Sequence, residues 1–259
     1  MPEPEWREIA GLSVEYNAVY AALSFWIAFL LFSRSTRALG ESTDKCSDWV
    51  LYAISGALVG ARVGYFVFEI PVQFIEEPGG LLWQPGFSFH GAVLGLLAGS
   101  ALFARSAGMA LSELCDRLAL GGSIGFLLMS LGALLSNSEV GMVSSSVIAL
   151  KFPIYDEGML VPPTRFPIFH VQCVWAALVV CLTVAAERRQ WLNSRAPGAT
   201  GALVIALIFA GLAVLDPLKE ERTHLAQSGY RITATILDIL LALGASYLLL
   251  RSTKLRLRA

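Results

Sequence analysis

Seven apolar stretches follow one another along the chain, separated by polar segments. An apolar stretch of about 17–25 residues is long enough to cross the roughly 30 Å hydrocarbon layer of a membrane as an α-helix. The alternation with a period of two that marks a transmembrane barrel is absent, and open strands cannot satisfy their backbone in lipid. The predicted spans are residues 16–32, 49–69, 87–103, 118–136, 168–186, 200–215 and 232–250. The pattern predicts an all-α integral membrane protein, folded as one seven-transmembrane helical bundle.

Lysine and arginine are distributed unequally between the two sets of loops that such a bundle creates. The set that includes the N-terminus carries six of these residues, and the set that includes the C-terminal tail carries twelve. Because loops rich in Lys and Arg stay in the cytoplasm, we expect the N-terminus outside and the C-terminus in the cytoplasm. The 31-residue loop 137–167 contains Pro153, Pro162 and Pro163, and it predicts a small extracytoplasmic cap.

Composition agrees with this fold class and excludes several others. Hydrophobic residues make up 56% of the chain and charged residues 15%, whereas a soluble domain has about 25% charged residues. A net charge of −1 offers no basic surface for nucleic acid, so no nucleic-acid partner is expected. The first 15 residues hold four Glu and one Arg, a pattern unlike a cleavable signal peptide. The four cysteines have no CxxC spacing, and we predict no disulfide framework, metal or cofactor.

Glycines recur every four residues on the second and third spans. The second span carries Gly56, Gly60 and Gly64, and the third carries Gly91, Gly95 and Gly99. Small residues at this spacing let helix backbones approach closely in lipid, where no hydrophobic force drives helices together. The glycines predict close packing within one compact bundle and are no guide to its activity.

Polar side chains also fall inside the predicted spans, where they are costly and mark a functional or paired site. Counted at about 1.5 Å per residue, they lie roughly 5–10 Å below the outer face. They are Tyr20, Arg62, His90, Ser130, Gln172 and Asp238. This common depth predicts a cavity that opens to the outside at the level of a phospholipid headgroup. In a structural alternative Asp238 neutralises Arg62, His90 caps the third span and Tyr20 belongs to the interfacial aromatic belt.

At these residues the chain resembles a known family of bacterial enzymes. Residues 83–95 read Trp-Gln-Pro-Gly-Phe-Ser-Phe-His-Gly-Ala-Val-Leu-Gly. They resemble the Trp-x-Gly-Gly-Met-Ser-Phe-His-Gly-Gly-x-x-Gly segment of phosphatidylglycerol–prolipoprotein diacylglyceryl transferases. Residues 60–65 resemble that family's Gly-(Gly/Ala)-Arg-x-Gly-Tyr, Asp116 matches an acidic residue at the start of span four, and Arg165-Phe166-Pro167 is similar to its Arg-His-Pro.

The resemblance implies a protein of the bacterial cytoplasmic (inner) membrane that acts on phosphatidylglycerol or another phospholipid and on a prolipoprotein signal peptide. Within it His90 is the candidate catalytic residue, because a thiol needs a base to supply thiolate at neutral pH. The candidate headgroup-binding residues are Arg62, Arg165, Tyr20, Ser88, Ser130, Gln172 and His170, with Asp238 as a structural charge partner. Other membrane subunits are a further expected class of partner.

The chain departs from the family's signature at the outer end of span four. The family carries Gly-Arg-x-Gly-Asn-Phe-x-Asn-Gly-Glu there, whereas this chain has Ser130 in place of the arginine and an acid that is absent or displaced to Glu139. Gln172 stands where the family has a glutamate. The family's arginine-bearing Phe-Arg…Glu-Phe-Phe-Arg stretch near span six corresponds to residues 211–219, which contain no arginine.

Two functions therefore remain open. The first is diacylglyceryl transfer from phosphatidylglycerol to a prolipoprotein cysteine, with Arg62, Arg165 and His170 substituting for the lost charges. The second is a catalytically degenerate homologue that binds phospholipid or serves as a scaffold subunit. If each lost arginine supplied about 2–3 kcal/mol, transfer would slow on the order of 10³- to 10⁴-fold. A small-solute transporter is less favoured, because the sequence has no internal repeat.

Overall fold

The computed structural model describes residues 6–9, 12–40, 42, 44–69, 75, 86–136, 140–151, 163–188, 197–220 and 228–256. Within these residues, seven helices are long and apolar enough to cross a membrane, which confirms the predicted fold class. The Trp83–Pro85 part of the histidine motif, Glu139, Pro153 and Pro162 lie outside the described residues.

The seven spans coincide with the predicted apolar stretches, and several run on into polar residues because a helix does not end where the lipid does. They are α1 (Tyr16–Ala38), α2 (Asp44–Gly64), α5 (Phe89–Ser106), α6 (Leu111–Ser136), α7 (Ile168–Arg188), α8 (Ala199–Leu215) and α9 (Ser228–Arg256). A π-helical turn, η1 (Tyr65–Glu69), continues α2, and a 3₁₀ turn, η3 (Asp216–Leu218), follows α8. Both turns fall at the end of the bundle that was predicted to face outward.

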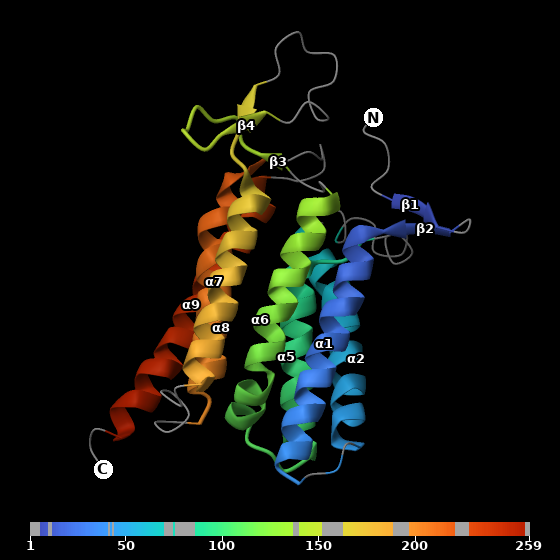
Figure 1. Ribbon diagram of the computed structural model, residues 1–259, viewed down its shortest axis with the longest axis vertical. Helices are drawn as coiled ribbons and strands as arrows, with labels where there is room; N and C mark the ends of the chain where they lie inside the picture. The colour runs from blue at the N-terminus through green and yellow to red at the C-terminus, as the bar shows by residue number, and fades with distance from the viewer. Residues whose placement is uncertain are drawn as a thin grey trace.

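Short strands gather at this same end (Figure 1). They are β1 (Trp6–Ile9), β2 (Leu12–Glu15), β3 (Val140–Gly141), β4 (Leu150–Lys151), β5 (Thr164–Arg165) and β6 (Lys219–Glu220). The antiparallel pairs are β1–β2, β3–β6 and β4–β5. The β3–β6 pair ties the segment after α6 to the segment after α8. The predicted cap is therefore partly a set of paired strands, and its exposure outside the membrane stays a prediction.

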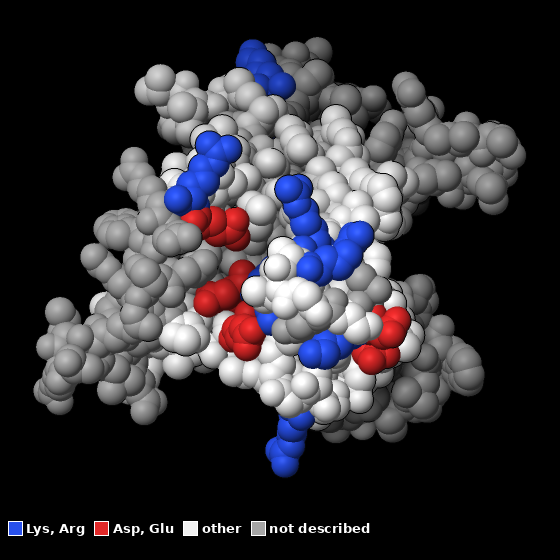
Figure 2. Space-filling model, turned by 60° about the horizontal axis from the view of Figure 1, so that its bottom comes forward, with Lys and Arg blue, Asp and Glu red and all other residues white. Residues whose placement is uncertain are grey.

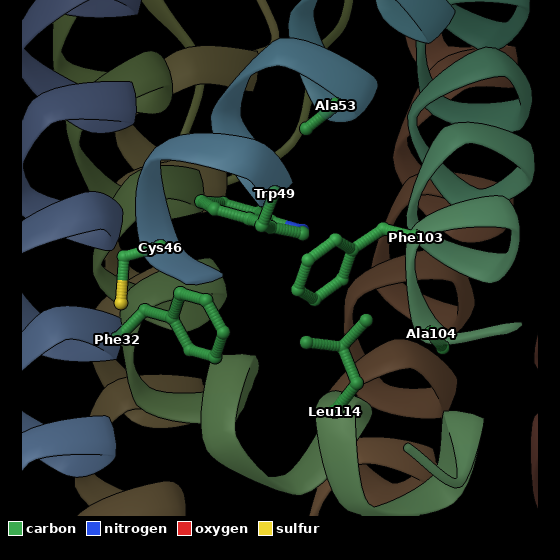
Figure 3. Packing of buried hydrophobic residues seen from close by; sticks show 7 residues of the cluster. All are labelled: Phe32, Cys46, Trp49, Ala53, Phe103, Ala104 and Leu114. Carbon is green, nitrogen blue, oxygen red and sulfur yellow. The ribbon is translucent and has the colours of Figure 1, made fainter. Parts of the chain in front are cut away.

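Helix α6 lies at the centre of the bundle and packs against α1, α5, α7 and α8 (Figure 1). Helix α2 packs along α5, and α9 packs along α8. A buried cluster near the other end of the bundle joins α1, α2, α5 and α6, as Figure 3 shows for Phe32, Trp49, Phe103 and Leu114. The indole Nε1 of Trp49 donates a hydrogen bond to Ser100 Oγ at 3.2 Å, so the ring's polar atom is also satisfied inside the cluster.

The glycines of α2 and α5 bring these two helices into backbone contact, as their spacing predicted. A Cβ atom added at Gly95 would lie 2.0 Å from the carbonyl oxygen of Gly56, and one at Gly60 would lie 2.3 Å from the carbonyl oxygen of Gly91. No side chain fits at these distances. Because Arg62 lies on α2 beside Gly60 and His90 lies on α5 beside Gly91, this contact also fixes where the two residues lie relative to each other.

Charged side chains gather at the opposite end of the bundle, where α1 and α5 end and α2 and α6 begin (Figure 2). Basic and acidic side chains lie next to one another on this face (Figure 2). The charged residues at these helix ends include Arg37, Lys45, Arg105 and Asp48. Their accumulation agrees with the predicted cytoplasmic face. The orientation itself stays a prediction.

Asp116 of α6 caps the N-terminus of α8, a helix that begins far later in the sequence. Its Oδ2 accepts a hydrogen bond from Gly198 N at 2.6 Å, and its Oδ1 accepts one from Gly201 N at 2.9 Å. A helix N-terminus leaves such donors unsatisfied and favours a negative charge. The acidic residue that the family resemblance singled out therefore holds two helices together.

We expect Asp116→Ala to lower the free energy of unfolding by about 1–2 kcal/mol, the usual cost of losing a cap. Thermal unfolding of the detergent-solubilised protein measures this loss. Glu113→Gln is the matched control, because the Glu113 side chain is 48% exposed and its ion pair lies within its own helix. Equal melting temperatures for the two variants would contradict the capping role.

Candidate functional site

His90 and Asp238 form a buried hydrogen-bonded pair between α5 and α9. The two atoms His90 Nε2 and Asp238 Oδ1 lie 3.0 Å apart, and the residues are 3% and 0% exposed. When Asp238 is a carboxylate, which can only accept, Nε2 is the donor of this hydrogen bond and Nδ1 keeps its lone pair. Nδ1 has no hydrogen-bond partner within the described part of the chain. A histidine oriented in this way by a carboxylate is the usual arrangement of a general base.

Ser88 holds the start of the helix that carries His90. It is the N-cap residue of α5, and its Oγ accepts a hydrogen bond from Gly91 N at 3.4 Å. Its own backbone N–H donates to Ala61 O on α2 at 3.0 Å. The alternative in which His90 caps this helix is wrong, because Ser88 supplies the cap and leaves the imidazole to Asp238. A headgroup contact by Ser88 stays a prediction.

Arg62 and Asp238, which were expected to face each other, each have another direct partner in the structure. Arg62 Nη1 donates to the carbonyl oxygen of Gly86 at 2.9 Å, and its guanidinium lies 4.5 Å from the centre of the Phe66 ring. The Asp238 carboxylate forms its hydrogen bond with His90. Depth along the helix axis was the sole basis for the pairing, and depth does not fix the direction in which a side chain points. Arg62 thus ties Gly86, just before α5, to α2.

Two further charged groups lie beside the His90–Asp238 pair, and neither was predicted from the sequence. Asp216 of η3 and Lys219 of β6 form an ion pair, with 2.9 Å between Oδ1 and Nζ. One ligand atom each of His90, Asp216 and Asp238 lies within 4.8 Å of the others, as a divalent metal ion would require. One of these carboxylates, that of Asp216, is already paired with the ammonium of Lys219. The signal in the sequence was an acid and a lysine three residues apart, directly after the sixth span.

Arg165, a predicted headgroup residue, lies at the same end of the bundle and is 8% exposed. Its Nη1 donates to the carbonyl oxygen of Gly141 at 3.5 Å. Gly141 is also the strand partner of Lys219 in the β3–β6 pair. A Cβ atom at Gly141 would lie 1.9 Å from Phe166 O, so this junction accepts only glycine. The structure thus brings Arg165 and Lys219 to one point of the cap.

Ser130 and Gln172, two of the predicted site residues, contact each other between α6 and α7. Gln172 Nε2 donates to Ser130 Oγ at 3.2 Å, and Ser130 Oγ donates to Phe126 O at 2.8 Å. Both residues are buried, so a neutral pair stands where the family resemblance implied an arginine and a glutamate. Tyr20 is half-buried on α1 and His170 is exposed in the first turn of α7. Their roles in headgroup binding stay predictions.

An apolar groove of about 640 Å³ follows the close contact of α2 and α5. Its walls include Gly56, Gly60 and Gly95, with Leu51 and Leu102 at its edges. The two leucines are 66% and 60% exposed, so this groove is part of the outer surface of the bundle. The predicted cavity around the polar layer is a different feature, and it stays a prediction.

Comparison with known proteins agrees with the resemblance in the sequence. Residues 4–250 match the family described as prolipoprotein diacylglyceryl transferase. A phosphatidylglycerol–prolipoprotein diacylglyceryl transferase of Methylibium petroleiphilum is 26% identical over 225 residues, which cover 84% of this chain and 82% of the relative. A protein of the same name from Chloroherpeton thalassium is 24% identical over 223 residues, 85% and 81% of the two chains. A third, from Oleidesulfovibrio alaskensis, is 32% identical over 157 residues, 58% of each. With its seven membrane-spanning helices, this chain belongs to the prolipoprotein diacylglyceryl transferase family.

Proposed function

We propose that this protein transfers the diacylglyceryl group of phosphatidylglycerol to the cysteine thiol of a prolipoprotein, in the bacterial cytoplasmic membrane. The names of its relatives support this lipid and this acceptor. The observation that carries the proposal is the buried His90–Asp238 hydrogen bond, because it prepares a base at the residue that the family's histidine motif supplies.

The reaction joins the thiol sulfur to the glycerol carbon that carries the phosphate. Nδ1 of His90 takes the thiol proton, the S–C bond forms, and the C–O bond breaks with its electron pair on the phosphate oxygen. Glycerol phosphate leaves, and the peptide keeps a thioether to diacylglycerol. A free thiol has a pKa of about 8.5, so the base is needed at neutral pH. Asp238 stabilises the imidazolium that results, as a carboxylate partner of a catalytic histidine does.

The experiment is phospholipid-dependent labelling of a peptide that carries a prolipoprotein cysteine motif. The purified protein, the peptide and phosphatidylglycerol are incubated together, and mass spectrometry measures the diacylglyceryl increment on the peptide. A peptide with serine in place of the cysteine is the control, because a hydroxyl is a far weaker nucleophile. We expect labelling of the cysteine peptide alone, and labelling that requires phosphatidylglycerol.

The neutral Ser130–Gln172 pair favours a second candidate function, in which the chain binds phospholipid without transferring it. A phosphate leaving group requires positive charge where its own charge develops, and this pair supplies none. In that case the cysteine peptide stays unlabelled at every phosphatidylglycerol concentration while the lipid still binds. That pair of results would replace the transferase proposal with the binding function.

A further inference from the structure

We infer that Lys219 supplies the positive charge that binds the phosphate of the lipid headgroup in this chain, assisted by Arg165. The inference deepens the proposed function and rests on it for the choice of lipid. Its basis is the position of the Lys219 ammonium, which is one carboxylate away from the His90–Asp238 pair.

Backbone hydrogen bonds hold Lys219 in a fixed position in the cap. Lys219 pairs with Gly141 in the β3–β6 ladder, and Met142 N donates to Leu218 O at 2.9 Å. Strand β6, which follows α8 and η3, is therefore held against β3 of the cap. The Lys219 side chain is 24% exposed, so it lies at the boundary between the buried pair and the outside.

Arg165 contacts the same junction. Its guanidinium contacts the carbonyl oxygen of Gly141, the strand partner of Lys219. A lysine presents a compact point charge and an arginine a planar fork, and both are common phosphate ligands. The two together offer a phosphodiester more positive charge than either does alone.

The balance of charge also fits a phosphate that leaves during the reaction. Lys219 forms an ion pair with Asp216, and one ligand atom of Asp216 lies within 4.8 Å of His90 and Asp238. When His90 takes the thiol proton, this cluster gains one positive charge at the moment when the departing phosphate gains negative charge. The Asp216 carboxylate has a positioning role, because it holds the Lys219 ammonium near the His90–Asp238 pair.

Lipid retention by the detergent-solubilised full-length protein tests the inference. Radiolabelled phosphatidylglycerol is the probe, and labelled diacylglycerol is the probe without phosphate. We expect Lys219→Met to weaken phosphatidylglycerol binding about 10- to 100-fold, in line with the loss of a charged hydrogen bond. Diacylglycerol binding should stay unchanged, and Lys219→Arg should keep phosphatidylglycerol binding within about threefold of wild type.

Lys151→Met is the matched control, because Lys151 is an exposed lysine of β4 in the same cap. Undiminished phosphatidylglycerol binding by Lys219→Met, or an equal loss of diacylglycerol binding, would overturn the inference. Retention of labelled inorganic phosphate that needs Lys219, without retention of phosphatidylglycerol, would also overturn it, because the site would then bind free phosphate only.

Lipid binding and peptide labelling, measured together, distinguish this inference from the proposed function. Lipid binding that depends on Lys219 without any peptide labelling would keep the phosphate site and reject the transfer. Peptide labelling that Lys219→Met leaves unchanged, in rate and in dependence on phosphatidylglycerol concentration, would keep the transfer and reject the phosphate site.

Discussion

His90→Ala is expected to lower the rate of peptide labelling about 10²- to 10⁴-fold, the usual contribution of a positioned general base. Asp238→Asn should cause a loss of the same order, because an amide no longer neutralises the imidazolium and leaves the Nε2 proton without an anionic acceptor. The measurement is the initial rate of thioether formation with saturating peptide and phosphatidylglycerol.

Asp48→Asn is the matched control for the carboxylate substitution, since Asp48 is exposed at the opposite end of the bundle. It should leave the rate unchanged. Thermal unfolding of each variant separates loss of chemistry from loss of fold. Wild-type labelling rates in His90→Ala, with the variant folded, would mean that the base lies elsewhere in the bundle.

Gly95→Ala is expected to prevent the native packing of α2 against α5. The added methyl carbon would lie 2.0 Å from the carbonyl oxygen of Gly56 and 2.8 Å from the Cα atom of Gly60, both backbone atoms that cannot rotate away. Overpacking in an ordinary core costs about 1–3 kcal/mol, and a clash with backbone exceeds that range because the helices must move apart. Size-exclusion chromatography and thermal unfolding in detergent measure the yield and stability of folded protein.

Gly122→Ala makes the same chemical change on α6, where a Cβ atom meets nothing within 4 Å. That variant should be as stable as wild type or slightly more so, since alanine favours the helix. Equal behaviour of the Gly95 and Gly122 variants would contradict the close approach of α2 and α5.

The fold was predictable because lipid imposes simple rules on a sequence. Apolar length indicated the spans, since unpaired backbone is excluded from the hydrocarbon layer. The glycine spacing on α2 and α5 indicated their close contact, since small residues along one helical face leave room for the backbone of a neighbouring helix. The strand pairs of the cap were beyond prediction, because β3 and β6 are two residues long and lie far apart in the sequence.

The site was predictable in part. His90 followed from its motif, and Asp238 was chosen because a buried acid requires a partner. The direct partner of Asp238 is His90, since depth along a helix leaves open which way Arg62 and Asp238 face. Asp216 and Lys219 were missed because they follow the apolar stretch of α8 and are far from His90 in the sequence, although Asp216 lies beside His90 in the structure.

The central claim is that His90 and Asp238 act as one unit in transfer to the thiol. A double-mutant cycle in the labelling assay tests it most directly, with His90→Ala, Asp238→Asn and the combined variant. If Asp238 works only through His90, the combined variant is no slower than His90→Ala alone. Independent, multiplicative losses in the combined variant would contradict the claim, since they would show that each residue contributes to the rate without the other.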